Sequence, residues 1–229
     1  MAPTRLAMDI EPLGEDALLL RFGEAIDAAV NARVHAVARR ITALGPPWLR
    51  DIVPAYASLA LFIDLEAFPS TVDPLDAATR WLRQQALDGD HAGMRTPRLV
   101  EIPVLYGGAD GPDLEAVAAH AGMSAGDVIE RHAAGDYRVA MLGFAPGFPY
   151  LLGLDPALSI PRLQTPRTRV TAGSVGIGGA QTGIYPRPGP GGWRIIGRTS
   201  AVLFDPLRGS PSLLLPGDRV RFLAADALP

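Results

Sequence analysis

Side chains able to recognise a small molecule stand isolated in the most glycine-rich part of the chain. Nine of the 25 residues from 173 to 197 are glycine, and glycine is favoured where φ is positive or where another group must approach the backbone closely. The polar and aromatic residues in and directly after this stretch are Gln181, Thr182, Tyr185, Arg187, Trp193 and Arg198. An amide beside a hydroxyl, as in Gln181 and Thr182, can orient an amide-like substrate. This stretch is the leading candidate for a binding site.

Charged and ionisable residues nearby extend this candidate site. Arg167 and Arg187 each follow a proline, and a guanidinium group can hold a carboxylate through two hydrogen bonds. The alternative is that these arginines are exposed charges or salt-bridge partners. Tyr185 and His132 are candidates for orientation or proton transfer, with an ordinary packing role as the alternative for His132. We therefore expect Gln181, Tyr185 and His132 in catalytic roles, and Thr182, Arg167 and Arg187 in substrate binding.

A second segment, residues 143–155 (GFAPGFPYLLGLD), combines glycine-containing turns with aromatic side chains. Its functional interpretation is a pocket wall in which Phe144, Gly147 and Phe148 face a ligand, partly through backbone amides. The equally supported alternative is a loop held against the rest of the fold by its aromatic rings.

Two familiar motifs fail in the glycine-rich stretch. Gly176 and Gly178 begin a G-x-G-x-x-G pattern, but the third glycine would have to stand where Gln181 is found. Ser174 lacks the glycine two residues earlier that a nucleophile elbow requires, since Ala172 occupies that position. Neither dinucleotide binding nor a serine nucleophile is indicated.

Missing residue types narrow the chemistry further. The chain contains no cysteine, which excludes disulfides and thiolate chemistry, and its 21 basic residues are all arginine. Without lysine there is no Schiff base, no phosphate-loop lysine and no biotin-bearing lysine. If ATP or a carboxyl carrier takes part in the reaction, another chain must supply the usual lysine.

The charge balance and the apolar runs indicate a cytoplasmic protein. The net charge of −3 comes from 21 basic and 24 acidic residues without long runs of one sign, so we expect no nucleic-acid partner. The longest apolar run, residues 57–63, is too short to cross a membrane. Residues 1–12 lack an apolar signal core.

The sequence pattern in the first half of the chain predicts alternating strands and helices. In chain order they are strand 17–22, helix 25–44, strands 51–53 and 58–63, helix 73–87 and strand 98–104. Apolar residues recur every three or four positions across 25–44, and Gly45 with two prolines ends that helix. Asp73 can cap the next helix, with Pro74 in its first turn. The order matches a ferredoxin-like split βαβ domain over residues 1–90, with a less regular α/β layer as the alternative. Residues 88–97, rich in glycine and charge, are the expected linker.

The second half, residues 98–229, predicts a β-barrel that follows two short helices. The helices are expected at 112–121 and 124–133, separated by Gly122. Short strands with turns between them are expected at 137–144, 169–177, 193–197, 201–204, 212–215 and 219–223. Many short strands of this kind are typical of a closed or nearly closed barrel.

Long motifs in both halves resemble one bacterial family. The matching segments are YRVAMLGFAPGFPYLLGLD, TPRTRVTAGSVGIGGAQTGIYP, GGWRIIGRT and PGDRVRF in the second half, with EPLGEDALLLRFGEAID and DIVPAYASLALFID in the first. They are similar to the family named variously as the 5-oxoprolinase B subunit, KipI-type kinase inhibitor or allophanate hydrolase subunit 1. The resemblance covers nearly the whole chain.

This resemblance implies an α+β protein with an N-terminal α/β domain followed by a cyclophilin-like β-barrel. It implies one component of an ATP-dependent 5-oxoprolinase that converts 5-oxo-L-proline to L-glutamate, with little activity alone. ATP and Mg²⁺ are then expected in the complex, with a companion C subunit (allophanate hydrolase subunit 2 family) and a third, the A subunit, as partners. The alternatives are a KipI-like inhibitor of a sensor histidine kinase and a carboxyltransferase-like protein related to urea carboxylase.

Overall fold

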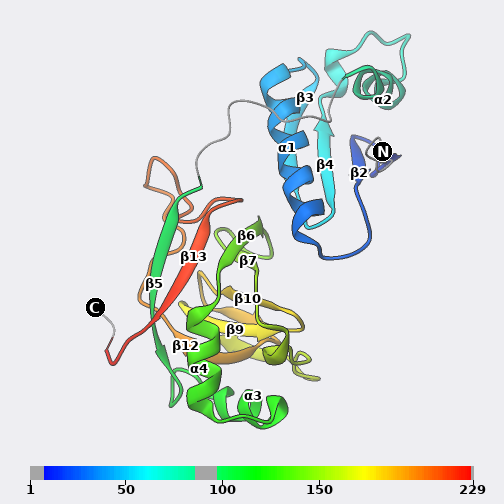
Figure 1. Cartoon of the computed structure of the whole chain (residues 1–229). Helices are drawn as coiled ribbons and strands as arrows, with labels where there is room; N and C mark the ends of the chain where they lie inside the picture. Colours follow the sequence, from blue (N-terminus) through cyan, green and yellow to red (C-terminus); the bar gives the residue numbers. More distant parts are fainter. Residues whose placement is uncertain (1–7, 86–96, 228–229) are drawn as a thin grey trace. The chain divides into compact units, whose positions relative to one another are not determined.

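The computed structural model describes residues 8–85 and 97–227, and the chain divides into two compact units, residues 1–95 and 96–229 (Figure 1). The expected linker at 88–97 lies outside the described residues except for Pro97. Together the two units form a mixed α/β fold. Among the described residues, no helix is long and apolar enough to cross a membrane.

The first unit is an antiparallel sheet with two helices. Its elements are β1 (Asp9–Pro12), β2 (Ala17–Arg21), α1 (Ala28–Leu44), β3 (Leu49–Pro54), β4 (Ser58–Ile63) and α2 (Pro74–Gln84), and its strands lie in the order β1–β2–β4–β3. The caps are those that the residue types predict, since Asp73 accepts a hydrogen bond from the backbone of Asp76 and Gly45 ends α1 in the left-handed conformation. The core contains side chains from β2, β4 and both helices.

One strand of the expected ferredoxin-like order belongs elsewhere. The strand predicted at 98–104 is β5 (Leu99–Tyr106), and it pairs with β12 (Arg194–Arg198) and β13 (Arg219–Ala224) of the second unit. The edge of the first sheet that this strand would occupy beside β2 is taken by β1 instead. The central order β2–β4–β3 agrees with the split βαβ pattern, and the edge strand comes from the beginning of the chain.

The second unit is a closed barrel. Besides β5, β12 and β13, its strands are β6 (Tyr137–Leu142), β7 (Pro149–Leu152), β9 (Ser174–Gly178) and β10 (Gln181–Ile184), and the order around the barrel is β10–β7–β6–β13–β5–β12–β9. A separate two-stranded sheet joins β8 (Arg167–Val170) to β11 (Gly189–Gly191). Neighbouring barrel strands run antiparallel except for β13 and β5.

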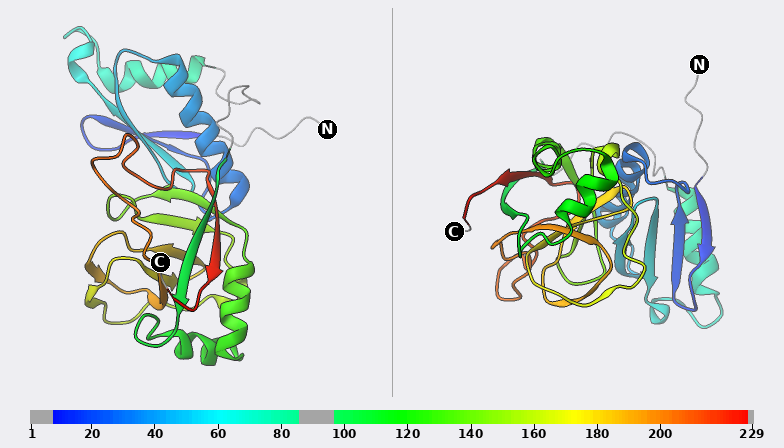
Figure 2. Two further views of the ribbon diagram at one scale, coloured as in Figure 1. Left: turned by 90° about the vertical axis from the view of Figure 1, so that its left-hand side faces the viewer. Right: turned by 90° about the horizontal axis from the view of Figure 1, so that it is seen from below.

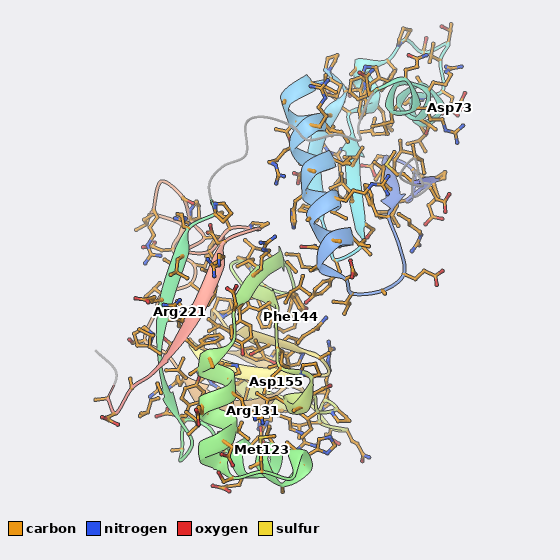
Figure 3. The ribbon with its side chains drawn as sticks, viewed as in Figure 1. Asp73, Met123, Arg131, Phe144, Asp155 and Arg221 are labelled. Atoms are coloured by element: carbon orange, nitrogen blue, oxygen red, sulfur yellow. The ribbon has the colours of Figure 1, made fainter. Side chains whose placement is uncertain are left out.

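Helices α3 (Leu114–Ala121) and α4 (Ala125–Ala134) pack against β12 and β13 of the barrel, respectively (Figures 1 and 2). Ser124 and Asp127 form a capping box at the start of α4. On the barrel side, Arg131 of α4 forms an ion pair of 2.8 Å with Asp155 (Figure 3). The predicted positions of both helices are confirmed to within two residues.

The strand predictions in the barrel are less accurate. The sequence predicts no strand at β7 or β10, and it predicts one strand over 169–177 where β8 and β9 are separate. The segments 201–204 and 212–215 are joined only by an isolated bridge between Phe204 and Ser212. Strand β10 has only four residues and no apolar alternation, so pairing with β7 and β9 creates a strand that local preference does not predict.

Candidate functional site

Strand β10 divides the expected site residues between two faces of the barrel wall, because successive side chains of a strand point to opposite sides. Thr182 pairs with Ile177, and Ile184, two positions further along the same face, belongs with Ile177 to the barrel core. Gln181 and Gly183 therefore face outward, and Tyr185 directly after the strand joins an outer cluster of aromatic side chains. Thr182 therefore lies on the opposite side of the wall from Gln181 and Tyr185, and of these three residues only Tyr185 lines the outer pocket.

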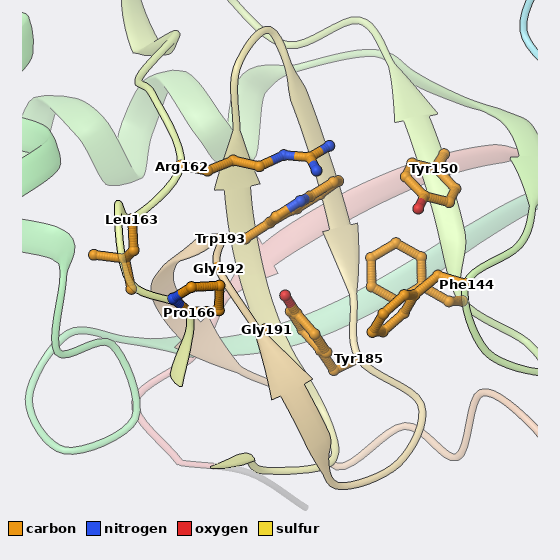
Figure 4. A pocket seen from close by; sticks show the side chains of 10 residues that line it. Phe144, Tyr150, Arg162, Leu163, Pro166, Tyr185, Gly191, Gly192 and Trp193 are labelled. Carbon is orange, nitrogen blue, oxygen red and sulfur yellow. The ribbon is translucent and has the colours of Figure 1, made fainter. Parts of the chain in front are cut away.

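The outer face carries a pocket with a volume of about 160 Å³ (Figure 4). The pocket is lined by Phe144, Phe148, Tyr150, Arg162, Leu163, Pro166, Tyr185, Gly191, Gly192 and Trp193. Its rings meet edge to face: the ring centroid of Phe148 lies 5.2 Å from that of Tyr185 and 5.5 Å from that of Trp193. Such contacts between aromatic rings are favourable and give the pocket a defined shape.

Glycines in the barrel wall leave the space that these rings occupy. A Cβ atom at Gly178 would lie 2.7 Å from the Trp193 ring, and one at Gly183 would lie 3.1 Å from the Phe148 ring. Any larger residue at these positions would push the rings away from the wall. The glycine-rich composition of this stretch is therefore a packing requirement of the aromatic pocket, because the rings lie directly on the backbone.

The loop that presents Phe144 is tightly turned at both of its corners. Ala145 donates a backbone hydrogen bond of 2.7 Å to Gly143, two residues earlier, and Phe144 between them has a φ of 65°. This is a three-residue γ-turn of the rare positive-φ kind. Phe148 closes a second turn by donating to Ala145, with Gly147 at a φ of 79°. Phe144 alone among the described residues other than glycine has a positive φ, and its side chain is 62% exposed.

We expect Phe144→Gly to be more stable than Phe144→Ala by about 1 kcal/mol, because only glycine adopts a positive φ without steric cost. Both variants remove the exposed ring, so the difference between them reports the backbone strain less the larger unfolded-state entropy of glycine. Urea unfolding of the two variants measures it. Equal stabilities would mean that the turn is not strained at this position.

The three arginines near this face differ in what they contact. Arg167 forms an ion pair of 2.8 Å with the buried carboxylate of Asp113, so it is already engaged in the fold. Arg187 is exposed and lies outside the pocket lining. Arg162 lines the pocket, with its guanidinium carbon 5.6 Å from the ring centroid of Trp193. This distance is that of a cation–π contact.

The phenol groups of the pocket keep their protons at neutral pH. Burial raises the pKa of Tyr185, and a backbone hydrogen bond from Trp193 and the charges of Arg162 and Arg167 only partly oppose this. Burial likewise raises the pKa of Tyr150 against the opposing charge of Arg162. Both hydroxyl groups are therefore hydrogen-bond donors, and they are close enough to Arg162 to be influenced by its charge.

His132 lies on the inner side of the wall, fully buried, and lines no part of the pocket. Its Nε2 atom is 3.0 Å from Oγ1 of Thr182, and its Nδ1 atom is 2.8 Å from the hydroxyl of Tyr106. The Thr182 hydroxyl donates to the carbonyl of Gly176, so it accepts from Nε2–H, and Nδ1 accepts from Tyr106. His132 is thus a neutral, fully hydrogen-bonded core residue in this arrangement.

The structure thus brings together Phe144, Phe148 and Tyr185, with Gly147 in the loop that carries two of them. Gln181 shares the outward face but is not part of the pocket lining, and Thr182 and His132 lie inside the barrel. Sequence reasoning missed Arg162, Leu163 and Pro166 of the lining, whereas Tyr150 lies in the 143–155 segment for which a pocket wall is one of the two interpretations. Position 162 has no local signal, since it is one of several arginines beside prolines.

Comparisons with known proteins agree with this architecture. Residues 8–214 match the family model described as carboxyltransferase domain, subdomain C and D. The chain is 43% identical over 219 residues to the 5-oxoprolinase B subunit of Bacillus subtilis, covering 93% of this chain and 91% of that protein. It is also 43% identical to the 5-oxoprolinase B subunit of Escherichia coli O157:H7 over 213 residues, covering 92% of this chain and 93% of that protein.

Solved structures show the same fold in longer chains. The crystal structure of TTHA0988 matches with a TM-score of 0.78 and 43% identity, covering 92% of this chain and 40% of that one. The urea amidolyase of K. lactis matches with a TM-score of 0.77 at 20% identity, over 95% of this chain and 15% of that one, which shows a shared fold alone. The resemblance inferred from the motifs is confirmed, and the chain belongs to the 5-oxoprolinase B-subunit family of carboxyltransferase-domain proteins.

Proposed function

We propose that this chain is the B subunit of an ATP-dependent 5-oxoprolinase complex, which opens the lactam of 5-oxo-L-proline to give L-glutamate. The observation that carries the proposal is the 43% identity to a 5-oxoprolinase B subunit, which extends over nearly the full length of both chains. The match covers 93% of this chain and 91% of that protein, so it includes both compact units.

The reaction requires activation because a lactam is a resonance-stabilised amide. Transfer of the terminal phosphate of ATP to the lactam oxygen would break that resonance. A first water then adds to the activated carbon and the ring C–N bond breaks, which leaves the γ-carboxyl as an acyl phosphate, and a second water releases the phosphate to give L-glutamate. A protein that binds the substrate must recognise a flat amide and a carboxylate and must hold both at a fixed position for this attack. The aromatic pocket fits the first of these tasks, with Phe144, Phe148 and Tyr185 as walls and the Tyr185 hydroxyl as a donor.

The remaining expected site residues take supporting roles in this proposal. Gln181 lies on the outward face of β10 opposite Gly178, over which the Trp193 ring lies, so it is adjacent to the pocket floor. Thr182 and His132 brace the same wall from inside through their hydrogen bonds. Arg167 holds β8 to Asp113 beside the pocket, and Arg187 remains a surface residue.

We place ATP and Mg²⁺ on another component of the complex. Among the described residues, no group of three or more His, Cys, Asp or Glu side chains gathers to hold a metal ion. The chain also lacks lysine, the usual phosphate-binding side chain of ATP sites. These two observations support placing magnesium and ATP on another chain; we propose the A and C subunits as the partners, with little activity in this chain alone.

The two units are proposed as separate domains, one related to the ferredoxin-like pattern in its central strands and one cyclophilin-like, in a cytoplasmic protein. A second candidate function is that of a carboxyltransferase-like component. The family model carries that description, and the fold matches part of a urea amidolyase. Such a protein would act with a carrier whose biotin is attached to another chain.

Reconstitution with the A and C subunits tests the proposal directly. We expect the three-component mixture to release glutamate from 5-oxo-L-proline only with ATP and Mg²⁺. Omission of any component should reduce the rate at least about 100-fold, because the proposal places the substrate pocket and the magnesium–ATP site on different chains. The same mixture supplied with bicarbonate and a biotin carrier tests the carboxyltransferase alternative. Carboxylation without glutamate release would exclude 5-oxoprolinase activity for this chain.

A further inference from the structure

Arg162 is the one pocket-lining residue of the described chain that carries a full charge at neutral pH. It is exposed, and within the described residues it forms no ion pair; its guanidinium carbon lies 5.6 Å from the ring centroid of Trp193. A nearby arginine is different in this respect, since Arg167 is held by the carboxylate of Asp113 at 2.8 Å. Arg162 thus has hydrogen-bond donors available for an anion, and it is already oriented by its stacking on an aromatic ring.

The charge of the pocket determines which kind of ligand its aromatic walls accept. A set of aromatic rings without a charge is suited to a cation such as a quaternary ammonium group. Here the guanidinium of Arg162 already lies over Trp193, and no acidic residue is among those that line the pocket in the described chain. A second cation would be repelled, whereas an anionic group would be attracted to the same position.

Shape and hydrogen bonding narrow the ligand further. The volume of about 160 Å³ admits only a small molecule, and the walls formed by Phe148, Tyr185 and Trp193 are flat ring surfaces. The hydroxyl groups of Tyr150 and Tyr185 point into the space bordered by Trp193 (Figure 4). The Tyr185 hydroxyl can donate a hydrogen bond to a carbonyl oxygen on a ring seated there.

We infer that this pocket binds a small, flat ring bearing a carboxylate, with Arg162 as the residue that binds the carboxylate and the Tyr185 hydroxyl as a donor to a ring carbonyl. The molecule that combines these features under the proposed function, on which this identification rests, is 5-oxo-L-proline. Arg162 then determines specificity, because it distinguishes the acid from the same lactam without its carboxylate.

A ligand panel measures each part of this inference separately. Ligand-observed NMR titrations of the full chain with 5-oxo-L-proline and with 2-pyrrolidone, which lacks the carboxylate, give two dissociation constants. We expect 5-oxo-L-proline to bind about 10- to 100-fold more tightly, the usual gain from a hydrogen-bonded charge pair. Arg162→Gln should remove this difference by weakening only the acid, and Arg162→Lys should restore part of it. Arg138→Gln, which changes an exposed arginine of β6 outside the pocket lining, is the matched control and should change neither constant.

The reconstituted complex separates this inference from the proposed function. If the complex releases glutamate and Arg162→Gln raises its KM for 5-oxo-L-proline about 10- to 100-fold, the pocket inference and the proposed function are both supported. Glutamate release with a KM that Arg162→Gln does not change overturns the pocket inference and leaves the function intact. If 5-oxo-L-proline binds in a way that depends on Arg162 but the complex releases no glutamate with ATP, the pocket inference is supported and the proposed 5-oxoprolinase function is overturned. Absence of binding to both the chain and the complex overturns the inference.

Discussion

Gly191→Ala is expected to eliminate binding of 5-oxo-L-proline to the pocket and to lower the free energy of unfolding by about 1–3 kcal/mol, the usual cost of overpacking. A Cβ atom at this position would lie 2.7 Å from Cζ of Tyr185 and within contact of its hydroxyl. The Tyr185 side chain is buried, with a relative exposure of 2%, and its ring packs between Phe148 and Phe144. It can make room for the added methyl group only by moving into the pocket.

Strand β11 supplies a matched control for this variant. Gly189 stands two residues earlier in the same strand, and a Cβ atom there would meet no atom within 4 Å. Gly189→Ala is therefore expected to leave both stability and ligand binding within about 0.5 kcal/mol of the parent chain. Equal effects of the two substitutions would show that Gly191→Ala acts by changing the flexibility of the strand. The predicted clash between a Cβ atom at position 191 and Tyr185 would then not be the cause.

The sequence predicts the helices and the general class of the second unit well because those signals are local. Asp73, Ser124 and the glycines after α1 and α3 mark helix ends through hydrogen bonds within a few residues. Strand β10 depends on two neighbours, β7 and β9, whose pairing with it no local pattern reveals. Because the sequence does not predict strand β10, it also does not predict that the side chain of Thr182 points into the barrel while those of Gln181 and Tyr185 point outward.

For the candidate site too, the sequence reveals features that depend on local composition and does not reveal those that depend on contacts between distant segments. Clustering of glycine with aromatic residues points to the region where the structure has an aromatic pocket, since Gly178, Gly183 and Gly191 all lie against rings of that pocket. It does not identify Arg162, whose position over Trp193 is created by a loop that no sequence periodicity describes. It also places His132 beside the substrate, because sequence distance to the site says nothing about the side of the barrel wall on which a residue lies.

His132 is expected to make the chain progressively less stable as the pH falls from about 6.5 to about 3. Burial lowers the pKa of His132 from 6.5 to about 3, while the unfolded chain takes up a proton near pH 6.5. Between these values the unfolded state binds more protons than the folded state, so the free energy of unfolding falls with decreasing pH. The contribution of this one residue is about 1.4 kcal/mol per pH unit in the middle of that window.

Burial is the reason why the folded chain resists this proton, and the hydrogen bonds of the ring define the neutral tautomer that the barrel holds. Both ring nitrogens are already used, because Nε2–H donates to Thr182 and Nδ1 accepts from Tyr106. Burial raises the pKa of Tyr106, so its hydroxyl keeps its proton and cannot become an acceptor by ionising. A proton added at Nδ1 would place a positive charge in the interior of the barrel, where the nearby aromatic ring of Phe222, stacked at 4.6 Å, offers no counter-charge.

Comparison of the parent chain with His132→Phe isolates this effect from the acid sensitivity of the many carboxylates. At pH 7 the variant should be less stable by about 1–3 kcal/mol, because Tyr106 and Thr182 lose a buried partner. As the pH falls from about 6 to about 4, only the parent chain must exclude a histidine proton, so the gap should narrow by about 1.4 kcal/mol per unit. Urea unfolding at pH values of about 7, 5.5 and 4.5 measures the gap, and His120→Gln, at an exposed histidine of α3, should not alter the pH dependence. A constant gap would mean that His132 takes up its proton in the folded barrel, and the one-directional chain of hydrogen bonds from Tyr106 to Gly176 would then be wrong.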